Sequence, residues 1–271
     1  MKPRLIWLYL VPAFVVLAAF FVLPIVRLIP ASASSESGWS LYLEVITNPR
    51  YSTCILSTIL LSLAVTLASI FIGGLTGIFL QRHRFPGRDA VVGIITLPLS
   101  FPGVVVGFMI IMLGGRNGLI GVLTHQLGAG KLVFAYGMAG LFLGYLYFSI
   151  PRVVTTVMAA VKKMDPMYEE AARTLGASSL RILKDVTLPA LAPALFGTGA
   201  LCFATSMGAF GTAFTLATDI NVLPITIYTE FTLSANIASA AMLSVVLGLI
   251  TWVMLVAARW FSSAGSFGKT A

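Results

Sequence analysis

Charged residues are scarce in this chain. Of its 271 residues only 10% are Asp, Glu, Lys or Arg, whereas 58% are hydrophobic and the mean hydropathy is +0.99. An ordinary soluble domain carries about 25% charged residues. The shortage excludes soluble secreted, nucleic-acid-binding and disordered proteins, and it predicts a membrane protein.

Cysteine and histidine are also rare. Cys54 and Cys202 are far apart, lie at the edge of or within apolar runs, and have no metal-ligand spacing around them, so we expect two small buried hydrophobes. His83 and His125 are predicted to lie on opposite sides of the membrane. There is no P-loop, GxSxG or HExxH pattern. The sequence therefore predicts no enzymatic activity, and no cofactor or metal bound by this chain.

Long apolar runs are what the chain has instead. A membrane-spanning helix needs about 20 apolar residues, and runs of that length occur at about 5–29, 55–80, 90–113, 132–161, 190–216 and 238–261. We therefore predict a single transmembrane domain, 1–271, of the all-α class with six membrane helices.

The first run has the look of a cleaved signal peptide, since basic residues precede it and Ala31-Ser32-Ala33 follows it. Its apolar core of about 25 residues exceeds the 7–15 of a signal peptide, so we expect it to remain as a span.

Glycine and proline mark two of the spans. Gly73, Gly74 and Gly77 near the end of the second span predict close approach of another helix. Pro98 and Pro102 interrupt the third span and free backbone carbonyls, which only a neighbouring helix or a wet cavity can satisfy.

The distribution of Lys and Arg predicts the orientation in the membrane. With the N-terminus inside, the inner segments carry Lys2, Arg4, Arg82, Arg84, Arg88, Lys162, Lys163, Arg173, Arg181, Lys184, Arg259 and Lys269. The outer loops keep only Arg27, Arg50, Arg116 and Lys131, with Arg152 at a boundary. Both termini are therefore predicted to be cytoplasmic. The net charge of +8 reflects this topology and does not indicate a nucleic-acid partner.

One polar segment, 162–189, separates the fourth and fifth spans and is predicted to form two short helices on the membrane surface. Asp165 is a suitable N-cap and Pro166 suits the first helical position. Gly176 is expected in the left-handed conformation that ends the first helix, Ser178 or Ser179 to cap the second, and Pro189 to close the segment.

The same segment carries the motif of the chain. Three residues separate Glu170-Ala171-Ala172 from Gly176, and nine residues separate Gly176 from Val186-x-Leu188-Pro189. This pattern resembles the EAA signature of permease subunits of binding-protein-dependent ABC importers, in which Ile is usual at the position of Val186. The resemblance extends from the second span to the sixth.

The resemblance implies a type I importer permease in the bacterial cytoplasmic (inner) membrane, with the EAA segment as the coupling helix that docks on a cytoplasmic ABC ATPase dimer. ATP and Mg would be bound by that separate ATPase. Glu170 would supply an acidic contact, Gly176 the turn, and Ala171 and Ala172 a closely packed face. The expected coupling residues are Glu169, Glu170, Ala171, Ala172, Arg173, Leu175, Gly176, Val186, Leu188 and Pro189.

The resemblance also implies a membrane-embedded pore shared with a second permease, a heterodimer being favoured over a homodimer, and a periplasmic or lipid-anchored solute-binding protein. LPLSFPGVVVGF and GRNGLIG resemble the branch that takes polyamines, sulfate, molybdate, iron and aminoethylphosphonate, and the stretch from Phe231 to Leu247 favours a polyamine-like solute. An anion or ferric iron is the alternative.

Ionisable or amide side chains near the membrane are candidates for the solute path. They are Asn117, Arg152, Asp219 and Glu230. Each has a simpler interpretation. Arg152 is alternatively a residue that extends to the inner headgroups, and Asp219 and Glu230 are alternatively solvated, or in contact with the binding protein, in an outer loop.

Two other classes of protein were weighed. A secondary transporter fits the proline-broken third span, but it requires inverted repeats and several carboxylates within the spans, and neither is found in the sequence. An intramembrane enzyme requires a polar catalytic pair at one depth, and Ser100, Ser149 and Thr155 have no His or Lys partner within the bilayer.

Overall fold

The computed structural model describes residues 3–34, 38–216 and 220–264, and within these ranges the chain forms helices and no β-strand. The elements of the first half are α1 (Pro3–Leu17), η1 (Ala18–Val22), α2 (Leu23–Ser32), η2 (Gly38–Ser40), α3 (Leu41–Thr47), α4 (Pro49–Arg82), α5 (Arg88–Thr96), η3 (Leu97–Ser100), α6 (Gly103–Gly114) and α7 (Leu119–Gln126). Those of the second half are α8 (Met138–Lys162), α9 (Met167–Thr174), α10 (Ser179–Ile182), η4 (Leu183–Thr187), α11 (Leu188–Met207), α12 (Phe210–Leu216), α13 (Leu223–Tyr228), η5 (Thr229–Leu233) and α14 (Ile237–Ala264).

The prediction of six membrane helices is confirmed. Within the described ranges, six helical stretches are long and apolar enough to cross a membrane: Leu10–Ser32, Pro49–Arg82, Gly103–Gln126, Met138–Lys162, Ser179–Met207 and Ile237–Trp260. Their bounds differ from the predicted ones, and for the third, fourth and fifth spans the difference has a local cause.

The third predicted span, 90–113, is not one helix. After α5 and the 3-10 turn η3, Phe101 and Pro102 are extended, and α6 starts at Gly103. A residue before proline is driven out of the α region, and proline itself has no N–H for the helix. The stretch that meets the length criterion is therefore Gly103–Gln126, formed by α6 and α7 together.

The fourth predicted span starts too early, because residues 132–137 are not helical. The N–H groups of Phe134 and Ala135 both donate to the carbonyl of Gly114 at the end of α6, at 2.9 and 3.0 Å. These bonds hold residues 132–137 against the end of α6 in a non-helical conformation, so that α8 begins only at Met138.

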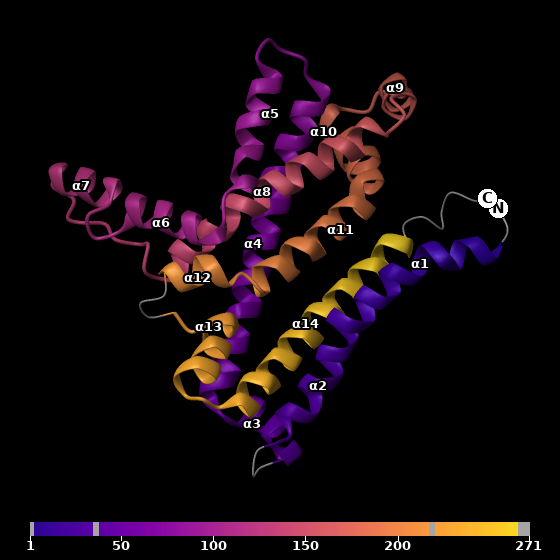
Figure 1. Cartoon of the computed structure of the whole chain (residues 1–271). Helices are drawn as coiled ribbons and strands as arrows, with labels where there is room; N and C mark the ends of the chain where they lie inside the picture. The colour runs from indigo at the N-terminus through magenta and orange to yellow at the C-terminus, as the bar shows by residue number, and fades with distance from the viewer. Residues whose placement is uncertain (1–2, 35–37, 217–219, 265–271) are drawn as a thin grey trace.

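The fifth predicted span, 190–216, is two helices. α11 ends at Met207, and the N–H of Gly208 bonds back to the carbonyl of Ala204 at 3.2 Å before α12 begins at Phe210. The break turns α12 away from the line of α11, beside α6 and α8 (Figure 1).

Three helices, α4, α8 and α11, cross at the centre of the molecule and form its core (Figure 1). α4 and α8 lie very close, since a Cβ added at Gly73 would lie 2.8 Å from the Cβ of Val153, and one at Gly77 would lie 2.9 Å from the carbonyl oxygen of Val154. Val153 and Val154 are fully buried. The predicted role of the glycines of the second span as a close-packing surface is thus met at these two positions.

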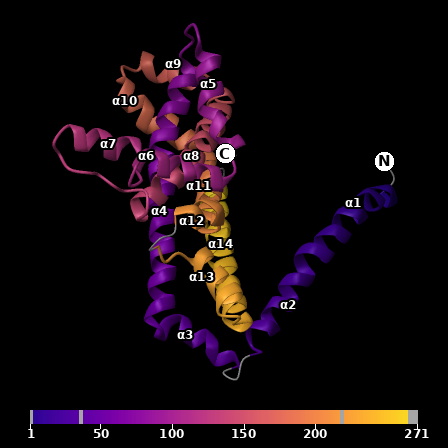
Figure 2. The ribbon, with the colours of Figure 1, turned by 60° about the vertical axis from the view of Figure 1, so that its left-hand side comes forward.

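The first span lies at the edge of the molecule. α2 packs against α14, whereas α1 diverges from the rest of the chain (Figure 2). The start of α1 and the end of α14 lie away from α3, which occupies the opposite end with α13 (Figures 1 and 2).

Candidate functional site

The segment between the fourth and fifth spans carries the helix α9 at one end of the molecule (Figure 1). Asp165 makes a capping hydrogen bond there, since its Oδ1 accepts from the N–H of Met167 at 2.9 Å. The predicted positions are one residue off, because Pro166 occupies the N-cap and the helix begins at Met167. Glu169 and Glu170 stand in the first turn, where carboxylates interact favourably with the helix dipole.

Gly176 ends α9 in the left-handed conformation, with φ of +78°, as predicted. The N–H of Ala177 bonds to the carbonyl of Ala172 at 3.1 Å, and that of Gly176 to Arg173 at 2.9 Å. This pair of bonds is the Schellman arrangement, which needs a residue free of the Cβ penalty at this position. Ser178 then caps α10 by accepting from the N–H of Arg181 at 3.4 Å. The glycine turn therefore has a rigid, hydrogen-bonded geometry.

The prediction that Pro189 closes the segment is wrong. α10 continues through the π-helical turn η4 into α11, so that one helical stretch runs from Ser179 to Met207. Pro189 lies in the first turn of α11. The end of the segment is thus built into the fifth span.

A polar network joins α9 to two neighbouring elements. The Glu169 carboxylate binds the Arg82 guanidinium at the end of α4, and Thr187 donates its hydroxyl to the same carboxylate oxygen at 3.1 Å. Arg82 also donates to the Thr187 hydroxyl at 2.9 Å. Glu169 is therefore held inside the chain, whereas Glu170 is exposed.

This network was not predicted from the sequence, because Arg82 is 87 positions from Glu169 and 105 positions from Thr187. Arg82 was predicted only as one of the positive residues of the inner face, and Thr187 was not singled out. Only a predicted contact between the end of the second span and the polar segment would have identified them.

The other face of the segment is open and partly apolar. Leu175 is 87% exposed and Leu180 is 75% exposed, with Met167 and Tyr168 also exposed on α9. Among the predicted coupling residues, Glu170, Ala171, Arg173 and Gly176 are exposed, as are Leu188 and Pro189 on α11, while Ala172 and Val186 are half-buried. Exposed apolar side chains beside charged ones on a short, fixed helix are typical of a protein–protein contact.

Arg152 lies near the middle of α8 and does not extend to the end of the helix. Its Nη1 donates to the Thr205 hydroxyl of α11 at 2.9 Å. Arg152 and Thr205 line an open cavity of about 360 Å³, together with residues of η3, α6 and α12. The Arg152 guanidinium is therefore bonded to a neighbouring helix, and the alternative interpretation, that the side chain reaches the inner headgroups, stays a prediction.

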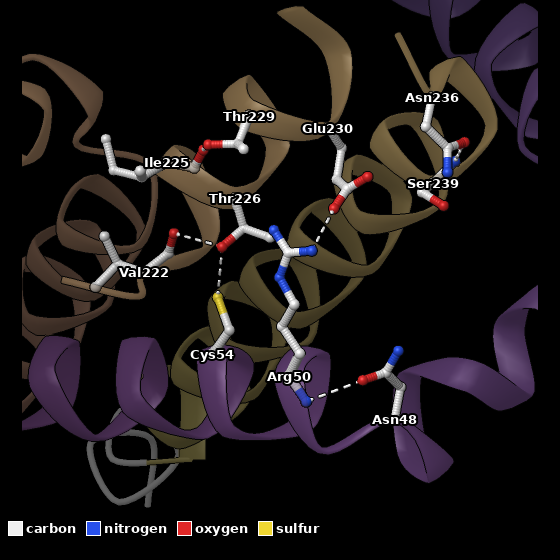
Figure 3. Close-up of polar contacts among 10 residues, drawn as sticks. All are labelled: Asn48, Arg50, Cys54, Val222, Ile225, Thr226, Thr229, Glu230, Asn236 and Ser239. Carbon is white, nitrogen blue, oxygen red and sulfur yellow. Dashed lines mark hydrogen bonds and ion pairs between the residues drawn. The ribbon is translucent and has the colours of Figure 1, made fainter. Parts of the chain in front are cut away.

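Glu230 does not lie in a loop. It belongs to the π-helical turn η5 and is only 3% exposed. Its carboxylate pairs with the Arg50 guanidinium at 3.2 Å (Figure 3). The prediction of a solvated outer-loop residue is therefore wrong, because the helix α13–η5 carries this carboxylate under the start of α4.

Asn117 is not brought together with Arg152. Asn117 is exposed in the turn between α6 and α7, where its Oδ1 accepts from Lys131 Nζ at 3.4 Å. Asp219 lies outside the described residues. Both cysteines are buried and free, as predicted, and the Cys54 sulfur is 3.1 Å from the Thr226 hydroxyl (Figure 3). The described residues contain no group of three or more His, Cys, Asp or Glu side chains that could hold a metal ion.

Six membrane helices, with a helix and a hydrogen-bonded glycine turn between the fourth and fifth, agree with the transport subunit that the EAA pattern predicts. Residues 69–264 match the family described as the inner membrane component of binding-protein-dependent transport systems. The chain belongs to this family, the permeases of ABC importers, and it is a multi-pass inner membrane protein. The permeases of this family do not hydrolyse ATP, which is the task of a separate ATPase chain.

Curated relatives agree with the family. The chain is 34% identical to the sulfate transport system permease protein CysT of Salmonella typhimurium over 200 residues, covering 72% of this chain and 71% of CysT. It is 31% identical to the molybdenum transport system permease protein ModB of Escherichia coli, covering 80% of this chain and 96% of ModB. A Salmonella typhimurium protein named for 2-aminoethylphosphonate transport, PhnU, is 28% identical over 94% of this chain and 93% of its own length.

Solved structures share the fold. A chain of a bacterial alginate ABC transporter, crystallised with an alginate-bound periplasmic protein, matches 96% of this chain and 94% of its own with a TM-score of 0.83 and 17% identity. A chain of the MetNI methionine ABC transporter matches 81% of this chain and 98% of its own with a TM-score of 0.63 and 17% identity. The type I importer permease fold predicted from the EAA pattern is therefore confirmed.

Proposed function

We propose that this chain forms half of the translocation pore of an ATP-driven importer for a small oxyanion, and that α9 is its coupling helix to a cytoplasmic ABC ATPase. The observation that carries the coupling role is the exposure of Glu170, Leu175 and Gly176 on a helix whose other side is fixed to the membrane domain through Glu169. A helix fixed in this way transmits a displacement by the ATPase to the membrane domain, because it cannot rotate independently of that domain.

The end of the molecule with α9 is proposed to face the cytoplasm. It carries Arg82, Arg84 and Arg88 as well as Lys162 and Lys163, which is the charge excess expected of the inner side. Both chain termini are proposed to lie on the same side, with α3 and α13 at the periplasmic end.

The solute class follows from the relatives and from one residue. CysT and ModB are named for sulfate and molybdenum transport and PhnU for a phosphonate, all of which are handled as oxyanions. The preference for a polyamine-like cation is not supported by these comparisons. Glu230 is also lost as a candidate ligand for a cationic solute, because its carboxylate is buried and paired with Arg50. A cation path would need free carboxylates.

The partners proposed are an ABC ATPase dimer, a second permease and a solute-binding protein, with a heterodimer of permeases favoured. The family description, a binding-protein-dependent transport system, supports the binding protein. ATP and Mg are assigned to the ATPase.

The experiment is purification of the chain from its native membrane, followed by identification of the proteins that accompany it. The accompanying binding protein is then tested by thermal shift against sulfate, molybdate, 2-aminoethylphosphonate and putrescine. Stabilisation by an oxyanion and recovery of an ATPase support the proposal. Stabilisation by putrescine alone, or solute uptake by the isolated chain without ATP, would overturn it.

A further inference from the structure

Two helix breaks meet beside α8, at one place in the core. The break at Phe101–Pro102 lies between η3 and α6, and the break at Gly208–Ala209 lies between α11 and α12. α6 and α12 pack against each other, and both pack against α8 (Figure 1). Residues of both breaks line the open cavity of about 360 Å³ that contains Arg152. The cavity is therefore a product of the broken third and fifth spans.

The cavity wall carries one positive charge and no negative one. Its lining includes Arg152, whereas no Asp or Glu belongs to it. Within the part of the chain that the structure describes, the Arg152 side chain makes one hydrogen bond, to Thr205, and no ion pair. A guanidinium has five N–H donors in a planar fork, so most of them remain available to a ligand.

The surroundings of the cavity strengthen the electrostatic effect of the Arg152 charge. Much of the lining is apolar, from Pro98, Leu99 and Phe148. An unpaired arginine within a membrane span is costly and is retained where it contacts water or a substrate. A charge beside apolar walls also acts over a longer range than one in water. Gly103 and Val104 of the first turn of α6 lie in the same wall, so the positive end of this helix dipole is close to the cavity.

We propose that this cavity is an oxyanion binding site on the translocation path, in which Arg152 attracts and holds the anion. The site rests on the proposed function, because it assumes an anionic solute. A planar guanidinium binds a carboxylate, phosphate or sulfate oxygen pair through two parallel hydrogen bonds. The cavity is open, so the anion exchanges with water and moves on.

A purely structural role for Arg152 is the competing explanation, in which its bond to Thr205 ties α8 to α11. Both explanations leave the positive charge of Arg152 in the cavity. They differ in whether an anion occupies the cavity, which a purely structural role does not require. A charged thiol reagent reports both the potential near Arg152 and its screening by an added anion.

The experiment places a cysteine in the cavity wall of the full chain within its membrane complex. Val104→Cys is introduced into a Cys54→Ala, Cys202→Ala background, since Val104 is 43% exposed and lines the cavity. Its rates of reaction with negatively charged sulfonatoethyl and positively charged trimethylammonioethyl methanethiosulfonate are compared in membrane vesicles. Leu127→Cys, 82% exposed after α7 and outside the cavity, is the matched control.

We expect Arg152→Gln to lower the ratio of the negative to the positive reagent's rate by about tenfold at Val104→Cys, as removal of one charge at short range predicts. Arg152→Lys should keep most of the ratio because it keeps the charge, and Leu127→Cys should not respond. Sulfate or molybdate should also slow modification of Val104→Cys only while Arg152 is present. A ratio that is the same with Arg152 and with Gln would overturn the site, and so would modification that sulfate and molybdate leave unchanged while Arg152 is present.

The outcome separates the site from the function. If the reconstituted complex imports an oxyanion while the ratio of the two reagent rates does not depend on Arg152, the proposed function is supported and the proposed site is refuted. If the ratio and the anion protection depend on Arg152 while the complex moves no oxyanion, the site stands and the proposed solute falls.

Discussion

Arg82, at the end of α4, binds the carboxylate of Glu169, in the first turn of α9. The pair connects the longest helix of the described chain to the exposed helix that carries the EAA pattern. Thr187 completes the contact by bonding to both partners. At its other end α4 is held by a second ion pair, between Arg50 and Glu230. The helix that packs on α8 through glycines is thus fixed at both ends.

We predict that Glu169→Gln lowers ATP-driven solute uptake several-fold more than it lowers ATP hydrolysis by the complex. The neutral side chain loses the charge-assisted bond to Arg82, so that α9 is less firmly fixed when the ATPase moves it. Uptake and phosphate release are measured together in proteoliposomes. Asp185→Asn is the matched control, because Asp185 is paired with Arg181 at 3.5 Å but is 56% exposed and should contribute little. Equal loss of uptake in both variants would contradict the prediction.

Charge reversal at Glu170 is expected to abolish uptake without preventing membrane insertion. Glu170→Arg places the wrong charge on the exposed side of α9, where the proposed ATPase contact lies, and Gly176→Asp imposes a side chain at a φ of +78°. Uptake is measured together with the amount of chain in the membrane and the amount of ATPase that copurifies with it. Asp89→Arg makes the same change at a 96% exposed side chain and should retain uptake. Normal uptake by Glu170→Arg would refute the coupling role.

The glycines of α4 provide a test of the core. Gly77→Ala should lower the stability of the chain by about 1–3 kcal/mol, because the new Cβ would meet backbone at 2.9 Å. Gly248→Ala in α14 is the control, since nothing lies within 4 Å of an added Cβ there. The apparent melting temperature in detergent is the measurement. An unchanged melting temperature for Gly77→Ala would show that α4 and α8 lie farther apart.

Removing Arg50 should lower the stability of the chain more than neutralising Glu230 does. Arg50→Ala leaves a buried carboxylate without its partner and should cost about 1–3 kcal/mol. Glu230→Gln leaves Arg50, 57% exposed, free to reach water, and should cost less than about 1 kcal/mol. Both are compared by thermal unfolding in detergent. A larger loss for Glu230→Gln would place the carboxylate in a role other than pairing with Arg50.

The composition and the local patterns of this sequence determined a large part of the molecule. Scarce charge and long apolar runs predict membrane helices because a bilayer accepts only segments that satisfy their own backbone hydrogen bonds. The glycine that ends α9 and the caps at Asp165 and Ser178 were also predictable, since capping depends on residues a few positions apart. The EAA spacing identified the family for the same reason.

The tertiary structure decided what local patterns cannot express. Proline by itself did not decide where a helix ends: Pro102 lies at a break, whereas Pro151 and Pro189 lie within continuing helical stretches. Glu230 was buried and Glu169 was tied to Arg82 by partners more than eighty positions away. The placing of Arg152 in a cavity depends on two helix breaks that meet only after folding. Contacts between distant segments are set by helix packing, and the sequence of each segment alone does not contain them.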